Sequence, residues 1–155
     1  MNTLDTTPTV AENVIHDWSM SYSMVPRAVS LMRVHVRRRL LMWAWDGDQE
    51  DATVIASELV TNAVRYSRVA GHLLDVRLAL LEGGALLIDV SDPVGAFPGF
   101  REHLIPSSDD EQGRGLPLIR ALGGELSLTL LANGGKTVRA HLPATAAVPE
   151  GRSQP

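Results

Sequence analysis

The sequence predicts an α+β fold, a two-layer α/β sandwich in which helices cover one face of a mixed, mostly antiparallel sheet. Two kinds of periodicity carry this prediction. Some segments alternate apolar and polar residues, as half-buried strands do, and others repeat apolar residues every three or four positions, as amphipathic helices do. Their order is strand, helix, helix, strand, strand, a long aperiodic stretch, helix, strand, strand. We expect the other face of the sheet to be at least partly exposed.

The first strand and the first helix follow each other closely. Residues Trp18–Met24 alternate large apolar side chains with serine, which predicts a half-buried strand. Pro26 then opens a helix at an early position that tolerates proline. The arginine run Arg37–Arg39 is predicted to lie on its solvated face, and Asp46–Asp48 ends it. The predicted core face repeats at steps of three and four: Val29, Met32, Val36, Leu40 and Trp43.

The second helix, predicted over residues 49–67, holds the most informative pair of side chains. At roughly 100° per residue, Glu58 and Asn62 lie about 40° apart on its surface. They stand at the edge of the apolar stripe that includes Ile55 and Leu59. Polar groups in such a place carry a desolvation cost unless something binds them. A metal ion bound to phosphate is one chemically natural answer.

Two hairpins and a short helix complete the expected fold. Residues 74–80 and 86–90 alternate around the turn 82–84, and residues 126–130 and 138–142 do so around the turn 133–135. Between the hairpins, residues 91–113 lack periodicity, and unstructured loops of this length are often functional lids. A short helix then begins after Gly113-Arg114-Gly115, has Pro117 in its first turn and ends at Gly123-Gly124.

Composition limits the possible functions. The chain has 155 residues, 45% of them hydrophobic, which is enough for one domain with a buried core. We expect that domain over residues 14–143, with disordered tails at 1–13 and 144–155. The net charge of −4 gives no general attraction to nucleic acid, and the absence of cysteine excludes disulfides and thiolate chemistry. No stretch is a secretory signal or a membrane span, so the cytoplasm is the expected location.

Three further motifs could carry chemistry, although each alone is weak. Asp92 closes a predicted strand, Gly113-Arg114-Gly115-Leu116 opens the short helix, and Gly135-Lys136-Thr137 lies in the last hairpin. An acidic strand end is usually a turn residue, and a Gly-x-Gly before a helix is usually a hinge. The Gly-Lys-Thr tripeptide lacks the strand-to-helix setting of a phosphate-binding P-loop.

Together, and in this order, the motifs resemble the GHKL superfamily of ATPases and kinases, which has the Bergerat (histidine-kinase-like ATPase) fold. The nearest branch is that of the bacterial anti-sigma factor serine-protein kinases, and the resemblance covers about residues 18–142. Glu58–Ala63 resembles the N-box of that family, and Asp92 resembles its adenine-binding aspartate. Gly113–Leu116 resembles the glycine box that closes the ATP lid. Thr137 resembles the last-strand threonine that supports the adenine.

The resemblance implies ATP and Mg²⁺ as cofactors and assigns roles to residues. Asn62 offers an amide oxygen to Mg²⁺, and Glu58 accepts the proton of an attacking hydroxyl. Asp92 accepts a hydrogen bond from the adenine amino group. Other candidate nucleotide-binding residues are Arg65, Gly95, Gly113, Arg114, Gly115, Leu116 and Thr137.

One departure from the family pattern concerns the loop after the aspartate. The family has Asp-x-Gly-x-Gly, whereas this chain has Asp92-Pro93-Val94-Gly95-Ala96-Phe97, with its single glycine displaced by one position. This departure bears on how closely the loop can approach a nucleotide.

The leading functional hypothesis is therefore an ATP-binding regulatory kinase. It would phosphorylate a serine of a small anti-sigma-factor antagonist and bind a sigma factor in competition, and the resemblance implies a homodimer. The alternative is a non-catalytic adaptor of the same fold, either ATP-sensing or nucleotide-free. The displaced glycine favours the adaptor, whereas the retained Glu58 and Asn62 favour the kinase. A third possibility is a two-layer domain that binds no nucleotide.

Overall fold

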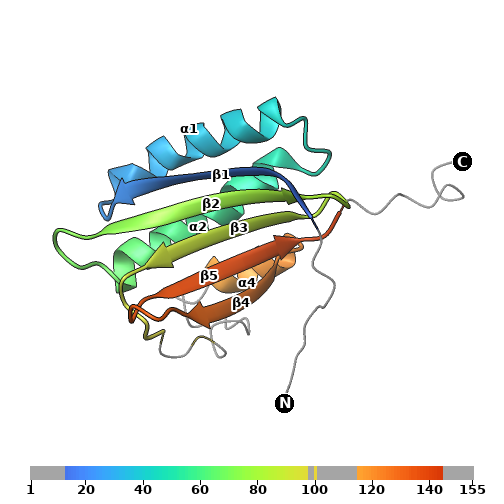
Figure 1. Cartoon of the computed structure of the whole chain (residues 1–155). Helices are drawn as coiled ribbons and strands as arrows, with labels where there is room; N and C mark the ends of the chain where they lie inside the picture. The colour runs from blue at the N-terminus through green and yellow to red at the C-terminus, as the bar shows by residue number, and fades with distance from the viewer. Residues whose placement is uncertain (1–12, 98–99, 101–114, 145–155) are drawn as a thin grey trace, which may run out of the picture.

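The computed structural model describes residues 13–97, 100 and 115–144 (Figure 1). The tails expected at 1–13 and 144–155 lie outside this range, apart from Asn13 and Ala144, and so does most of the stretch 91–113. Gly113 and Arg114 also lie outside the described residues. Of the expected domain, 14–143, the structure therefore describes everything except residues 98–99 and 101–114, so that only residues 91–97 and Phe100 of the long stretch are included.

The described residues form five strands and three helices in the order that the sequence predicts. The sheet order is β1-β2-β3-β5-β4, and every neighbouring pair is antiparallel. The fold class is confirmed, but the expectation of a mixed sheet is wrong for the described strands, since none of them pairs in parallel. The elements are β1 Val14–Ser23, α1 Arg27–Met42, α2 Gln49–Tyr66, β2 Leu73–Leu81, β3 Leu86–Asp92, α4 Gly115–Ala121, β4 Glu125–Leu130 and β5 Lys136–Leu142.

The hydrophobic core lies between the sheet and the helices, which cover one face (Figure 1). On β2, β3 and β5 the even-numbered side chains face the helices, as the period of two predicts. In α1 the buried residues are Ala28, Met32, Val36 and Leu40, whereas the predicted Val29 and Trp43 lie at the margin of the core. From the sheet the core receives Leu74, Val76, Leu78, Leu80, Leu86, Ile88, Val90, Val138, Ala140 and Leu142.

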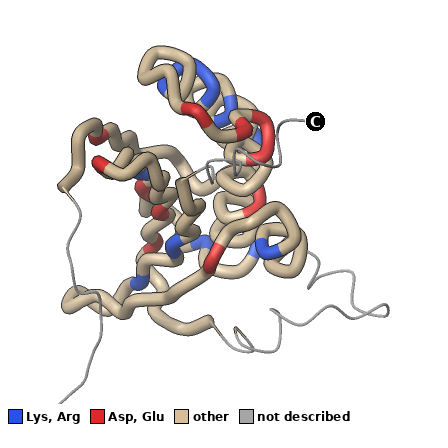
Figure 2. The backbone as a smooth tube through the Cα atoms, turned by 90° about the vertical axis from the view of Figure 1, so that its right-hand side faces the viewer, with Lys and Arg blue, Asp and Glu red and all other residues tan. Residues whose placement is uncertain are grey.

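Helix α1 is strongly basic, with five arginines and no acidic residue, and its charges stand at the top of Figure 2. Two members of the run Arg37–Arg39 make contacts within the molecule. Arg37 forms two hydrogen bonds with Glu50 at the start of α2, at 2.9 and 3.2 Å, and Arg39 lies over the Trp18 ring at 5.8 Å. Arg38 is exposed, as the prediction of a solvated face requires.

The helix ends are set by local hydrogen bonds. α1 ends in a Schellman motif, in which Trp45 N–H donates to Leu40 O and Ala44 N–H donates to Leu41 O. Ala44 has φ = 52° there, in the left-handed region. Asp48 then caps α2 by accepting the Asp51 N–H at 2.9 Å.

The opposite face of the sheet carries a row of alternating charges across four strands. Asp17 on β1 pairs with Arg77 on β2 at 2.8 Å, and Arg77 lies 3.6 Å from Asp89 on β3. Asp89 in turn makes two hydrogen bonds with Arg139 on β5, at 2.7 and 2.9 Å. The Arg77 guanidinium holds the pKa of Asp17 below its usual value through this hydrogen bond. The middle of this face is therefore polar and partly exposed, and a small separate apolar cluster of Ala79, Leu81, Ala85 and Leu87 is buried at one end of β2 and β3.

Candidate functional site

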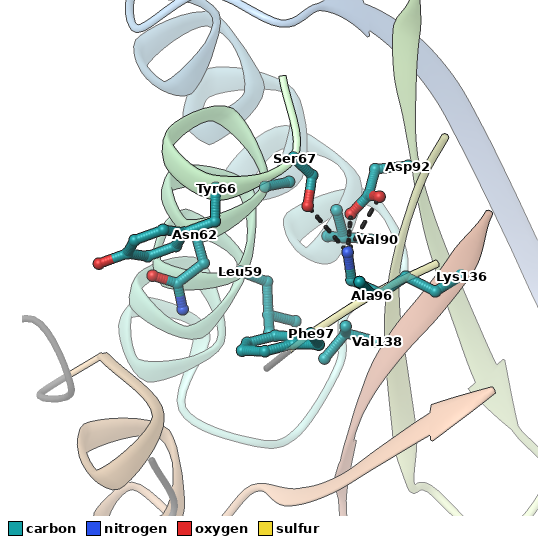
Figure 3. A pocket seen from close by; sticks show the side chains of 11 residues that line it. Leu59, Asn62, Tyr66, Ser67, Val90, Asp92, Ala96, Phe97, Lys136 and Val138 are labelled. Carbon is teal, nitrogen blue, oxygen red and sulfur yellow. Dashed lines mark hydrogen bonds and ion pairs between the residues drawn. The ribbon is translucent and has the colours of Figure 1, made fainter. Parts of the chain in front are cut away.

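A pocket of about 300 Å³ opens between α2, the end of β3, the start of β5 and the loop after β3 (Figure 3). Its walls are mostly apolar, and its polar groups are few, which is the usual make-up of a small-molecule site. The lining residues are Leu59, Asn62, Ala63, Tyr66, Ser67, Val90, Asp92, Ala96, Phe97, Lys136 and Val138.

The structure brings Asn62 and Asp92 to this one pocket, from α2 and from the end of β3. Asn62 is half-buried, and Tyr66 lies one turn after it on the same helix. Glu58 lies one turn before Asn62, half-buried and outside the pocket lining. Arg65 is also outside the lining, because it points to solvent with its guanidinium 5.8 Å from the centre of the Tyr66 ring.

The Asp92 carboxylate is held by the ammonium of Lys136, the only lysine in the chain (Figure 3). Lys136 Nζ lies 3.0 Å from each Asp92 oxygen, and both side chains are only 2% exposed. The ammonium also donates to Ser67 Oγ at 2.8 Å and to the Val94 carbonyl at 2.7 Å. The Val94 N–H donates to Asp92 Oδ1 at 2.9 Å.

This network offsets the desolvation cost of burying two charged side chains. All three ammonium N–H groups have acceptors, and the Phe97 ring adds a cation–π contact at 5.4 Å. Removing either charge of such a pair typically costs about 3–5 kcal/mol, because it leaves the other charge buried alone. The pair therefore fixes the floor of the pocket.

Lys136 was missed by the reasoning from sequence, although a signal for it was present. The predicted core residues of the last strand, Val138, Ala140 and Leu142, are all even-numbered. Alternation then places Lys136 on the same side of the sheet, facing the pocket. Thr137 is on the opposite side, where its hydroxyl lies 2.6 Å from Ser91 Oγ. The structure therefore does not bring Thr137 to the pocket.

Gly95 is explained by a close approach of two backbones. A Cβ at Gly95 would lie 2.7 Å from the carbonyl oxygen of Gly134, and a Cβ at Gly135 would overlap the Asp92 carbonyl. The loop after β3 therefore packs directly on the β4–β5 turn, and glycine is required on both sides of the contact. Gly95 is not among the pocket-lining residues.

The remaining glycine-box residues lie at α4. Gly115 is the first residue of this helix, and Leu116 is 2% exposed within the hydrophobic core. Leu116 thus packs between layers and does not line the pocket.

The donor set of the pocket fits a purine nucleotide with its metal. The apolar walls match the faces of a base, and Asp92 at the floor matches a base N–H. The Asn62 amide oxygen is a ligand type that Mg²⁺ accepts together with phosphate oxygens. No group of three or more histidine or acidic side chains that could hold a metal alone occurs among the described residues.

The comparison with protein families defines the class of this protein. Residues 23–142 match the model of the histidine kinase-like ATPase domain. The chain therefore belongs to this family, and its domain is an ATP-binding domain of the GHKL type. No curated protein matches the chain. In the described part of the chain, none of the helices has the length and apolar character needed to cross a bilayer.

Two of the solved structures that share the fold match more than four fifths of this chain. The first is the RsbU and RsbW domains of Rv1364c from Mycobacterium tuberculosis, with a TM-score of 0.57 and 19% identity; the match covers 83% of this chain and 32% of that one. The second is the SiaB–SiaC complex from Pseudomonas aeruginosa, with a TM-score of 0.56, 16% identity and coverage of 84% and 90%. Our chain spans about a third of the Mycobacterium chain, and at these identities the likeness concerns the fold alone.

Proposed function

We propose that this protein is an ATP-binding regulatory protein that phosphorylates a serine of a small anti-sigma-factor antagonist and binds a sigma factor in competition. One observation carries the proposal. The Asn62 amide and the Asp92 carboxylate come from separate elements and line the same apolar pocket of an ATPase-type domain. The resemblance of the sequence to the anti-sigma kinases supports the choice of partners and a homodimeric state.

The chemical type of each residue decides its proposed role. Asn62 would hold Mg²⁺ through its amide oxygen, and Asp92 would accept a hydrogen bond from the base. The bound metal nucleotide would supply the phosphoryl group and neutralise its developing charge. Glu58 lies one helical turn before Asn62, half-buried and outside the pocket lining. It would take the proton of the serine hydroxyl as the oxygen attacks.

A second candidate function is an adaptor without transferase activity, and the Lys136–Asp92 pair favours it. Each oxygen of the proposed base-binding carboxylate already contacts the ammonium at 3.0 Å. A nucleotide must share this carboxylate with the lysine, and this sharing makes the free energy of nucleotide binding less favourable. The two candidates differ in whether Glu58 does chemistry.

Substitution of Glu58 by glutamine separates the two. If the protein is a kinase, Glu58→Gln should lower serine transfer by about 10²-fold or more, because the carboxylate takes the proton of the serine. The affinity for Mg²⁺-ATP should stay within about threefold of the natural value, because the carboxylate does not bind the nucleotide. Glu50→Gln is the matched control, because it makes the same chemical change two turns earlier on α2, at an exposed site. Affinity is measured by calorimetry, and transfer by phosphopeptide mapping of partner proteins captured from native cells.

Substitution of Asn62 by alanine tests the metal role in the same assays. We expect Asn62→Ala to bind ATP with one affinity whether or not Mg²⁺ is present, whereas the natural protein binds more tightly with Mg²⁺. Serine transfer that survives Glu58→Gln at full rate would exclude Glu58 as the base, and a natural protein that binds Mg²⁺-ATP but transfers no phosphoryl group to a captured partner would exclude the kinase and leave the adaptor. A natural protein whose melting temperature does not rise with Mg²⁺-ATP would exclude nucleotide binding altogether.

A further inference from the structure

We propose that the Lys136–Asp92 pair makes this pocket accept purine nucleotides that carry a 6-oxo group as well as those that carry a 6-amino group. The inference rests on the proposed nucleotide function, and it names the ligand class of the same pocket. It comes from the one buried ion pair at the pocket floor (Figure 3).

A carboxylate that faces position 6 of the base selects strongly for the amino group. It has only acceptor oxygens, so in that position it binds the 6-amino N–H groups of adenine and repels the 6-oxo oxygen of hypoxanthine or guanine, whose N1–H donor lies one position along the edge. In a buried site this repulsion is not relieved by water, and a site built for one hydrogen-bonding pattern rejects the other strongly. A pocket in which Asp92 alone faced position 6 of the base would therefore be selective for ATP.

Here the carboxylate is not alone. The Lys136 ammonium lies 3.0 Å from each Asp92 oxygen, and the 2% exposure of both side chains excludes screening by solvent. The floor of the pocket therefore has no net charge. It holds an acceptor carboxylate and a donor ammonium side by side, and both residues belong to the pocket lining. The three N–H groups of the ammonium are donated to Asp92, Ser67 and Val94, so a ligand reaches this donor only by replacing one of these contacts.

Such a pair matches either purine edge. The adenine edge offers an amino donor next to the N1 acceptor, and the 6-oxopurine edge offers an oxygen acceptor next to the N1–H donor. The two edges carry donor and acceptor in exchanged positions, so with a shift of the base in its plane each edge can place its donor towards Asp92 and its acceptor towards Lys136. The ammonium has further acceptors in Ser67 Oγ and the Val94 carbonyl, so it can exchange one of these contacts for the ligand without losing Asp92.

The test compares ATP with ITP, because the two share sugar and triphosphate and differ only at this edge of the base. Dissociation constants of both Mg²⁺ complexes are measured by calorimetry on the full chain. We expect the two constants to agree within about tenfold, which is about 1.4 kcal/mol. A preference for ATP beyond tenfold overturns the inference and leaves the proposed function standing. If neither nucleotide binds, the proposed function fails and the inference fails with it.

Lys136→Met then assigns the effect to the lysine. Without the ammonium, the ratio of the ITP constant to the ATP constant should rise at least tenfold, and a smaller rise overturns the role of Lys136. Thr129→Ala, an exposed change on the neighbouring strand β4, is the control and should keep the natural ratio. If Lys136→Met does not fold, Lys136→Gln replaces it. Its neutral amide still offers N–H donors to a 6-oxo oxygen, so it should keep the natural ratio, and a tenfold rise would overturn the role of a donor at position 136.

Discussion

At the scale of single residues, Tyr22 joins β1 to α1 through a hydrogen-bonded phenol. Its hydroxyl lies 2.6 Å from His35 Nδ1, and the side chain is 4% exposed. Burial raises the pKa of Tyr22 from 10.0 to about 12, because the phenolate would lose its hydration. The folded state therefore favours the neutral phenol over the phenolate.

Stability should fall at alkaline pH through this residue. Its contribution is fully present below pH 10, where the phenol is neutral in both states, and is lost as pH rises towards 12. Over that range we expect the free energy of unfolding to fall by roughly 2 kcal/mol more in the natural protein than in Tyr22→Phe. Urea denaturation at several pH values measures it. Tyr66→Phe is the control, and equal slopes for all three proteins would contradict the prediction.

Among the site residues, sequence reasoning could reach those that combine a polar group with a regular element. Asn62 was predicted from its place at the edge of an apolar helical stripe, and Asp92 from its place at a strand end together with the resemblance to the GHKL superfamily. Lys136 was missed because its partners, Ser67 and Val94, lie in irregular backbone after α2 and after β3. Alternation could give the direction of the lysine but not the three acceptors that surround it.

At the scale of elements, the end of α1 stores strain at one position. Ala44 is the only non-glycine residue with positive φ in the described part of the chain. For an L-residue with a Cβ, the left-handed region costs about 1 kcal/mol or more, and helices usually place glycine there.

Ala44→Gly should therefore stabilise the protein. The relieved strain exceeds the added freedom of glycine in the unfolded chain, and we expect a net gain of about 0.5–1 kcal/mol, or roughly 1–3 °C in the melting temperature. Differential scanning calorimetry measures the shift. Ala70→Gly, at an exposed turn position with ordinary φ, is the matched control and should lower stability slightly. An unchanged or lower melting temperature for Ala44→Gly would show that the backbone there is unstrained.

The helices and strands were predictable because their apolar periods are long and regular. Their ends were less so. The sequence suggested that Asp46–Asp48 ends α1, whereas the helix ends at Met42 through backbone hydrogen bonds of Ala44 and Trp45. Alanine carries no signal for a left-handed cap, so this end could not be predicted from residue type.

At the scale of the whole molecule, the row Asp17–Arg77–Asp89–Arg139 connects four of the five strands on the polar face. Its members are unequal, because the Asp89 side chain is 9% exposed and the Asp17 side chain is 51% exposed. Asp89 also forms ion pairs with two arginines, which lie on two different strands, whereas Asp17 pairs with one arginine.

Asp89→Asn should consequently destabilise the protein more than Asp17→Asn. We expect a loss of about 2–3 kcal/mol for Asp89→Asn, since Arg77 and Arg139 then face each other without an anion, and less than about 1 kcal/mol for the exposed Asp17→Asn. Urea denaturation at pH 7 gives both values. Added salt should narrow the difference only slightly, because the pair at Asp89 is largely shielded from solvent. Equal losses of unfolding free energy would contradict the prediction, because they would mean that the burial of Asp89 makes its ion pairs no stronger than exposed ones.

The sheet order belongs to this scale, and the sequence alone left it open. Two hairpins were predictable from their turns, but the pairing of β3 with β5 joins strands separated by α4 and β4. Local periodicity cannot predict that contact, because the two strands are far apart in the sequence. This long-range pairing brings Lys136 opposite Asp92 in the register and thereby closes the pocket floor.

The single lysine has a practical consequence for chemistry at this pocket. Every other cationic side chain except histidine is an arginine, so an acylating reagent that targets primary amines meets one side chain only, at the floor of the site, besides the amino terminus. The rate of the second addition in intact mass, after the amino terminus has reacted, would follow the exposure of that floor. Protection by a bound ligand could thus be read without a label or an engineered residue.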